Sequence, residues 1–125
     1  MIVVGGGVIG TEYASMLAAL GVRVTLIEGR ARLLDFVDAE ITEALQYHLR
    51  QSGVTLRLGE KVVKIEKREA PEAQKREGVL EVVEATLESG KTLTADTLLY
   101  AIGRQGCTEG LNLSAAGLTP SQSAN

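Results

Sequence analysis

Residues 1–16, MIVVGGGVIGTEYASM, decide how this sequence folds. Residues 2–4 form a short β-branched run, which is typical of the end of a buried strand. Three glycines follow, and in the next segment, 8–20, apolar residues recur every three or four positions. The apolar face of this helix comprises Ile9, Tyr13, Met16, Leu17 and Leu20. The stretch therefore predicts a strand, a tight glycine turn and an amphipathic helix.

The alternation of strand and helix continues along the first half of the chain. Residues 22–27 (VRVTLI) and 54–58 (VTLRL) indicate β-branched strands, with a helix over 38–52 between them. Gly21 stands where a left-handed residue would end the first helix, and Asp38 stands where a side chain would cap the second. The order strand-helix-strand-helix-strand, with short loops, predicts a parallel sheet with right-handed crossovers.

The second half of the chain has a different character. Short antiparallel strands are indicated at 61–67, 79–87 and 91–93. The polar stretch 68–78 is expected to be a mobile loop, and 97–102 (TLLYAI) a buried strand that returns to the parallel sheet. After Arg104 the periodicity is lost, and residues 119–125 form a polar tail. The fold class predicted is a Rossmann-like α/β domain, a parallel sheet with an antiparallel β-meander crossover.

Composition excludes several classes of partner. The chain has 125 residues, 45% of them hydrophobic and 23% charged, as expected for one globular domain with a real core. A net charge of −3 and the lack of a basic stretch with aromatics argue against a nucleic-acid partner. No apolar run reaches the roughly 18 residues of a membrane helix. We therefore expect a cytoplasmic protein with neither nucleic acid nor membrane as partner.

The inventory of reactive side chains is small. Cys107 is the only cysteine, so no disulfide can form within the chain and no thiolate metal site is possible. His48 is the only histidine, which makes a histidine zinc site or a Ser-His-Asp triad unfavourable. We assign neither a metal ligand nor a catalytic residue, and expect the 125-residue chain alone to be inactive.

The glycine turn has the spacing of a dinucleotide-binding loop. Gly5 would allow the tight turn, Gly7 would let the backbone approach a pyrophosphate, and Gly10 would let the helix pack close to the strand. Val8 and Ile9 complete the loop, whose free N–H groups would face the phosphates. A bare GxGxxG is also compatible with a structural turn, but here a strand precedes it and a helix follows.

The end of the second predicted strand carries charged residues that bear on the choice of nucleotide. Glu28 stands 18 residues after Gly10, where an acid can accept hydrogen bonds from both hydroxyls of an adenosine ribose. It would repel a 2′-phosphate, which favours NAD. Arg30 and Arg32 could instead bind such a phosphate, which favours NADP, or belong to a solvated loop. The sequence leaves both alternatives open.

Three stretches resemble one family closely. Residues 5–14 (GGGVIGTEYA), 24–28 (VTLIE) and 99–104 (LYAIGR) are similar to the nicotinamide-nucleotide domain of the pyridine nucleotide-disulfide oxidoreductases. These flavoproteins have two dinucleotide-binding domains. The resemblance implies that residues 1–102 are an NAD(P)-binding domain with a clipped first strand. Residues 103–125 would begin the return to an FAD-binding domain outside this chain.

The resemblance also implies roles for further residues. Glu12 matches a glutamate near the nicotinamide, while Val62 and Gly103 match positions that line it. Cys107 departs from the family, which usually has asparagine there, and it does not match the redox cysteines. FAD would be bound mainly by absent parts of the parent protein, which would be a homodimer or higher homo-oligomer through an absent C-terminal domain.

Residues 29–41, 45–49 and 98–113 resemble one subgroup of the family, a transhydrogenase that moves hydride between NADPH and NAD through FAD. Two alternatives stay open: a fragment of dihydrolipoyl dehydrogenase or a related disulfide reductase, and a stand-alone dinucleotide-binding module. The sequence upstream of Met1 would separate them, because a CxxxxC pair there would exclude the transhydrogenase.

Overall fold

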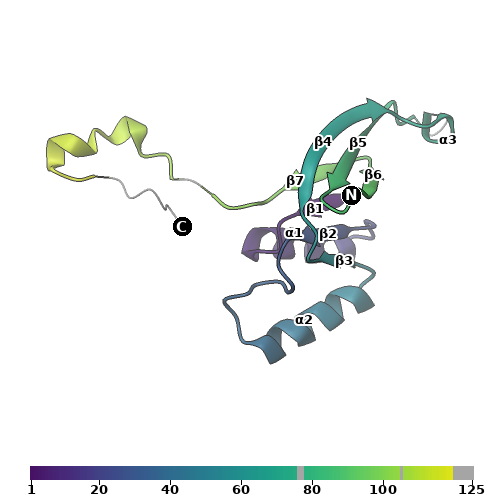
Figure 1. Cartoon of the computed structure of the whole chain (residues 1–125), viewed down its shortest axis with the longest axis horizontal. Coiled ribbons are helices and arrows are strands. Elements are labelled where there is room, and N and C mark those ends of the chain that lie inside the picture. The colour runs from purple at the N-terminus through teal and green to yellow at the C-terminus, as the bar shows by residue number, and fades with distance from the viewer. Residues whose placement is uncertain (76–77, 105, 120–125) are drawn as a thin grey trace.

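The computed structural model describes residues 1–75, 78–104 and 106–119, and it confirms the predicted fold class (Figure 1). The parallel sheet comprises β1 (Ile2–Val4), β2 (Thr25–Glu28), β3 (Thr55–Leu58) and β7 (Leu98–Tyr100), in the order β3-β2-β1-β7. All three pairings are parallel, and Val3 of β1 is in register with Leu26 of β2 and Leu99 of β7. Strand β2 begins at Thr25 and not at Val22 as predicted, because the N–H of Val22 donates to the carbonyl of Leu17 at the end of the preceding helix.

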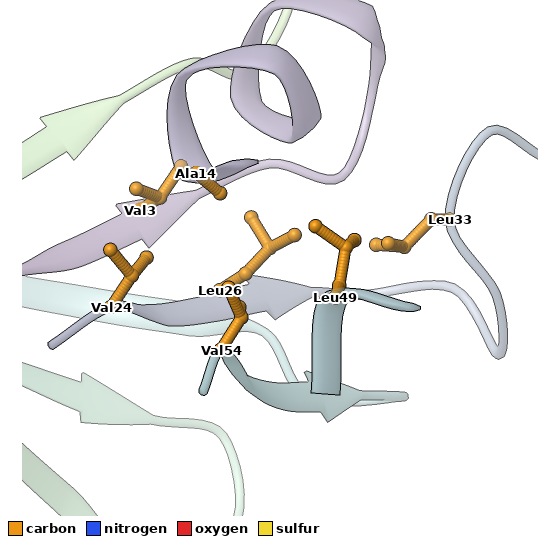
Figure 2. Close-up of a cluster of buried hydrophobic side chains, with 7 residues drawn as sticks. All are labelled: Val3, Ala14, Val24, Leu26, Leu33, Leu49 and Val54. Carbon is orange, nitrogen blue, oxygen red and sulfur yellow. The ribbon is translucent and has the colours of Figure 1, made fainter. Parts of the chain in front are cut away.

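Two helices, α1 (Val8–Ala19) and α2 (Ala39–Gln51), cover one face of this sheet (Figure 1). Figure 2 shows the buried apolar cluster between them, made of Val3, Ala14, Val24, Leu26, Leu33, Leu49 and Val54. Leu33 reaches this cluster from the loop after β2, although it belongs to neither a helix nor a strand. That loop is therefore held against the core at the edge where β2 ends.

The other face of the parallel sheet is covered by an antiparallel sheet of β4 (Val62–Glu69), β5 (Glu81–Leu87) and β6 (Thr92–Ala95). Side chains alternate along a strand, so that Val3 faces the helices while Ile2 and Val4 face the other way. A second buried cluster forms there, comprising Ile2, Val4, Ile27, Ala85 and Leu87. The meander is thus inserted between β3 and β7, as predicted, and completes a third layer.

Both predicted helix-end signals are confirmed. Gly21 has φ +86°, and its N–H donates to the carbonyl of Ala18 (2.9 Å) while that of Val22 donates to Leu17 (3.0 Å). This pair of hydrogen bonds is a Schellman motif. At the start of α2 the Asp38 carboxylate accepts a hydrogen bond from the backbone N–H of Glu40 (2.9 Å).

The predicted packing face of α1 is only partly right: Leu17 packs against the buried cluster, but three of the five predicted residues do not. Tyr13, Met16 and Leu20 are exposed, by 47%, 53% and 79% of their surface. The buried residues of the helix are instead small: Gly10, Thr11 and Ala14. The helix starts so close to the glycine loop that a side chain on Gly10 would collide with the carbonyl oxygen of Gly5. Large apolar side chains are therefore excluded from the face that meets β1.

The predicted mobile loop over 68–78 is also partly wrong. Strand β4 continues to Glu69, and a short helix, α3 (Glu72–Lys75), follows it. The Lys75 ammonium pairs with the carboxylates of Glu69 (3.2 Å) and Glu72 (3.1 Å), which ties the helix to the strand. Residues 76–77 of this stretch lie outside the described residues.

After β7 the chain runs away from the sheets and forms two 3₁₀ turns, η1 (Glu109–Leu111) and η2 (Leu113–Ala116), where no element was predicted (Figure 1). Most of the predicted polar tail, 120–125, lies outside the described residues. Over the part of the chain that is described, no helix has the length and apolar character needed to cross a membrane.

Candidate functional site

A pocket of about 800 Å³ opens at the carboxyl ends of β1, β2 and β7. It is lined by residues 4–5, 27–30, 60–62 and 101–103, together with Gly7. From β1 the chain continues to β2 on one side of the sheet, and β7 lies on the other side. The pocket is therefore at a topological switch point, which is where open parallel sheets bind their ligands.

The glycine loop forms one wall of this pocket, and its glycines meet different constraints. Gly5 has φ +109°, and a Cβ atom there would lie 2.6 Å from the carbonyl oxygen of Ala101. Gly10 is close-packed against Gly5, as predicted. Gly7 differs, because a Cβ on it would meet no atom within 4 Å. Gly5 and Gly10 are thus required by packing, whereas Gly7 leaves open space beside the pocket.

Gly6 has a role that the sequence did not reveal. Its N–H donates a hydrogen bond of 2.6 Å to Oε2 of Glu28. A Cβ atom on Gly6 would lie 2.5 Å from Cδ2 of Leu33 and 2.9 Å from Oε2 of Glu28. The GxGxxG pattern leaves this position open, so only the glycine triplet itself could have indicated a constraint here.

The Glu28 carboxylate is the most heavily engaged polar group of the pocket. Its side chain is only 7% exposed. Oε1 accepts hydrogen bonds from the backbone N–H (2.8 Å) and Nε (2.9 Å) of Arg30, while Oε2 accepts from Gly6 and from Nη2 of Arg30 (3.3 Å). Burial alone would raise the pKa of Glu28, but the hydrogen bonds from Arg30 and Gly6 outweigh it and lower the pKa. Glu28 is therefore a stable carboxylate at neutral pH.

Arg30 lies at the mouth of the pocket with its side chain half exposed. Its hydrogen bonds to Glu28 and then Asp35 raise the pKa of the guanidinium further above its usual value. Arg32 is placed differently. Its guanidinium donates to the backbone carbonyl of Asp35 (3.0 Å), and the residue does not line the pocket.

Lys61 is a pocket residue that sequence reasoning missed. Its aliphatic chain crosses Gly29, where a Cβ atom would lie 3.0 Å from Cγ of the lysine. The neighbouring Glu60 carboxylate turns to the meander, where a hydrogen bond from the Ser89 hydroxyl (2.8 Å) lowers its pKa. No carboxylate in the described ranges forms an ion pair with Lys61. The sequence could have indicated Lys61 as a pocket residue only through its position just after β3, at the carboxyl edge of the sheet.

The pocket brings together six of the residues predicted from sequence, namely Gly5, Gly7, Glu28, Arg30, Val62 and Gly103. It does not bring together the other five, which are Val8, Ile9, Gly10, Glu12 and Arg32. Gly10 packs behind the loop, and Val8 and Glu12 are exposed on α1. Cys107 is also exposed, in the segment beyond the sheets.

The fold and the pocket define an open α/β domain with a glycine-rich strand-to-helix loop and an acid at the end of the second strand. Residues 1–123 match the family model described as pyridine nucleotide-disulphide oxidoreductase. The chain belongs to this family.

Curated relatives share about half of its residues. It is 49% identical over 118 residues to a soluble pyridine nucleotide transhydrogenase of Mycobacterium bovis BCG, covering 94% of this chain and 23% of the relative. It is equally identical, over 120 residues, to a protein of the same name from Photobacterium profundum, covering 96% of this chain and 23% of that protein. The chain thus spans less than a quarter of the length of either relative.

Solved structures of the family have the same fold. The HOCl-induced flavoprotein disulfide reductase RclA of Escherichia coli superposes with a TM-score of 0.79 at 32% identity, over 97% of this chain and 25% of RclA. LpdA of Mycobacterium tuberculosis gives a TM-score of 0.76 at 28% identity, over 94% of this chain and 23% of LpdA.

Proposed function

We propose that this chain binds a nicotinamide dinucleotide, NAD or NADP, in the pocket at the carboxyl ends of β1, β2 and β7. One observation carries the proposal: the ionised, buried Glu28 is hydrogen-bonded to the glycine loop at the mouth of a switch-point pocket. A carboxylate in that place can accept the hydroxyls of an adenosine ribose, while the adjoining loop receives the pyrophosphate.

The loop has room for the pyrophosphate. Gly7 is the N-cap of α1 and offers no side chain to its first-turn N–H groups. These groups and the helix dipole favour an anion there. Because the space around Gly7 is open, a phosphate can approach the backbone directly. The residues present therefore fit the nucleotide that the family implies.

In the longer protein we propose the role of a soluble transhydrogenase, since that is the name of the curated relatives. Residues 1–102 would be its NAD(P)-binding part, and the chain beyond would lead toward an FAD-binding part, in a cytoplasmic homo-oligomer. The FAD of the longer protein, when bound, would supply the chemistry that moves hydride between NADPH and NAD⁺. Glu12, Val62 and Gly103 would lie toward the nicotinamide end, and their task would be to orient the ring.

The test of binding uses the 125-residue chain itself. Its fold is first verified by circular dichroism. Calorimetric titrations with NAD⁺, NADH, NADP⁺ and NADPH should then show binding of at least one dinucleotide, and ATP, which lacks the second nucleotide, should bind more weakly. A folded chain that binds none of the four would refute the proposal.

A disulfide reductase is the second candidate, and the name and structure of RclA favour it. Both candidates use the same nucleotide pocket, so binding to this chain does not separate them. The coding sequence upstream of Met1 separates the two candidates. A CxxxxC pair there would support the reductase, and a frame that continues upstream without such a pair would support the transhydrogenase.

A further inference from the structure

The carboxylate that would receive the ribose is already saturated. Glu28 accepts four hydrogen bonds, and an ionised carboxylate offers about four lone-pair sites. Two of the four come from the Arg30 guanidinium. A ribose diol therefore cannot reach Glu28 until that guanidinium moves away.

The Arg30 side chain lies at the surface of the chain and not in its core. Its side chain is 49% exposed, and its other partner, Asp35, is 43% exposed at the surface. Loss of the guanidinium contacts would still leave Glu28 with two backbone donors, the N–H groups of Gly6 and Arg30. The glycine loop and the carboxylate would then keep their places while only the arginine swings outward.

With the guanidinium in place, the pocket is suited to a different ligand. Arg30 offsets part of the negative charge of Glu28 and Asp35, both of which would otherwise repel a phosphate. A guanidinium has five N–H donors, and three of those of Arg30 are used within the chain, on Glu28 and Asp35. The remaining two N–H donors are available to a phosphate oxygen.

Resting on the proposed nucleotide site, we propose that Arg30 occupies two positions in turn and thereby lets one pocket take both nicotinamide nucleotides. Paired with Glu28, it admits the 2′-phosphate of NADP. Displaced from Glu28, it exposes the carboxylate to the 2′- and 3′-hydroxyls of NAD. Arg30 is thus a specificity-determining residue. It would bind the 2′-phosphate of NADP in one position, and in that same position it covers the Glu28 carboxylate that NAD needs.

The first test compares Arg30→Gln with the wild-type chain by calorimetry. The affinity for NADP⁺ should fall about tenfold or more, because a charge-assisted contact is lost. The affinity for NAD⁺ should stay the same or rise, because the ion pair between Arg30 and Glu28 no longer has to be broken before the ribose binds. Arg23→Gln is the matched control: Arg23 precedes β2 at the opposite edge of the sheet, so its loss should leave the ratio of the two affinities unchanged.

The second test observes the Arg30 side chain directly in the wild-type chain. Its Nε–H group donates to Glu28 and should give a slowly exchanging guanidinium signal in ¹H–¹⁵N NMR spectra. Saturation with NADP⁺ should preserve that signal. Saturation with NAD⁺ should shift it and speed its exchange with water, which a purely structural arginine would not do.

The possible outcomes are distinct. Equal losses for both nucleotides in a folded Arg30→Gln chain, or an Nε–H signal that responds to neither, would overturn the inference and leave the proposed function standing. A folded wild-type chain that binds no dinucleotide would overturn both. If Arg30→Gln does not fold, the NMR test on the wild-type chain decides alone.

Discussion

The backbone N–H of Gly6 donates a 2.6 Å hydrogen bond to the carboxylate of Glu28, 22 residues further along the chain. This contact joins the end of β2 to the loop that follows β1. The acid proposed to receive the ribose therefore also fixes the loop proposed to receive the pyrophosphate. One short hydrogen bond thus joins two parts of the proposed nucleotide site.

Glu28→Gln tests the ligand role of the acid. We expect the binding free energy of NAD(H) to weaken by about 1–3 kcal/mol, because hydrogen bonds to a charged acceptor are lost. NADP(H) should weaken less or improve, because a negative neighbour of its 2′-phosphate is removed. Calorimetry with both nucleotides measures the difference. Equal losses would mean that Glu28 only supports the loop.

Glu28 should also make the stability of the folded chain depend on pH. The pKa of Glu28 is lower in the folded chain than its ordinary value of 4.5, because the donors on Arg30 and Gly6 outweigh its burial. The folded state thus binds this proton less readily than the unfolded state. The stabilisation is fully present above pH of about 4.5 and is lost as the pH falls through the lower folded value.

Urea unfolding at a series of pH values from about 3 to 7 measures this dependence. The free energy of unfolding of the wild-type chain should decrease more steeply on acidification than that of Glu28→Gln. The other acids with a lowered pKa, Glu60 and Glu66, are common to both chains and cancel in the comparison. Parallel curves for the two chains would contradict the prediction.

Much of the fold could be predicted from local signals. The strand and helix periods gave the order of the elements, and Gly21 and Asp38 marked helix ends because their effects involve only neighbouring residues. Gly5 and Gly10 were also recognisable, since the turn and the close helix packing are properties of one short loop.

The rest depends on residues that are distant in sequence. Gly6 is constrained by Leu33 and Glu28, which only the folded chain brings beside it. The packing face of α1 follows from how close the helix lies to β1, and hydrophobicity does not encode that distance. Lys61 enters the pocket because β3 ends beside β2, so it carries no motif of its own.

Gly6→Ala tests the packing of the loop. The added methyl group would overlap Leu33 and the Glu28 carboxylate, so we expect a loss of about 1–3 kcal/mol in the free energy of unfolding. Nucleotide binding should weaken as well, because Glu28 is displaced. Chemical unfolding and calorimetry measure the two effects.

Gly7→Ala is the matched control for that substitution. A Cβ atom on Gly7 meets nothing within 4 Å, so stability should fall by less than about 1 kcal/mol, the usual effect of alanine at an N-cap. Binding should nevertheless weaken, because the methyl group occupies space proposed for the pyrophosphate. Unchanged affinity for every dinucleotide would place the phosphates elsewhere.

The two faces of α1 should differ in how well they tolerate substitution. Ala14 is fully buried and contributes to the cluster shared with Val3, so Ala14→Leu should overpack it and lower the free energy of unfolding by about 1–3 kcal/mol. Met16 is 53% exposed on the same helix, and Met16→Gln retains a similar helix propensity. Its effect should therefore stay within about 0.5 kcal/mol. Urea unfolding of both variants gives the comparison. A large loss for Met16→Gln with a small one for Ala14→Leu would mean that the helix packs through the apolar face that its sequence pattern first indicated.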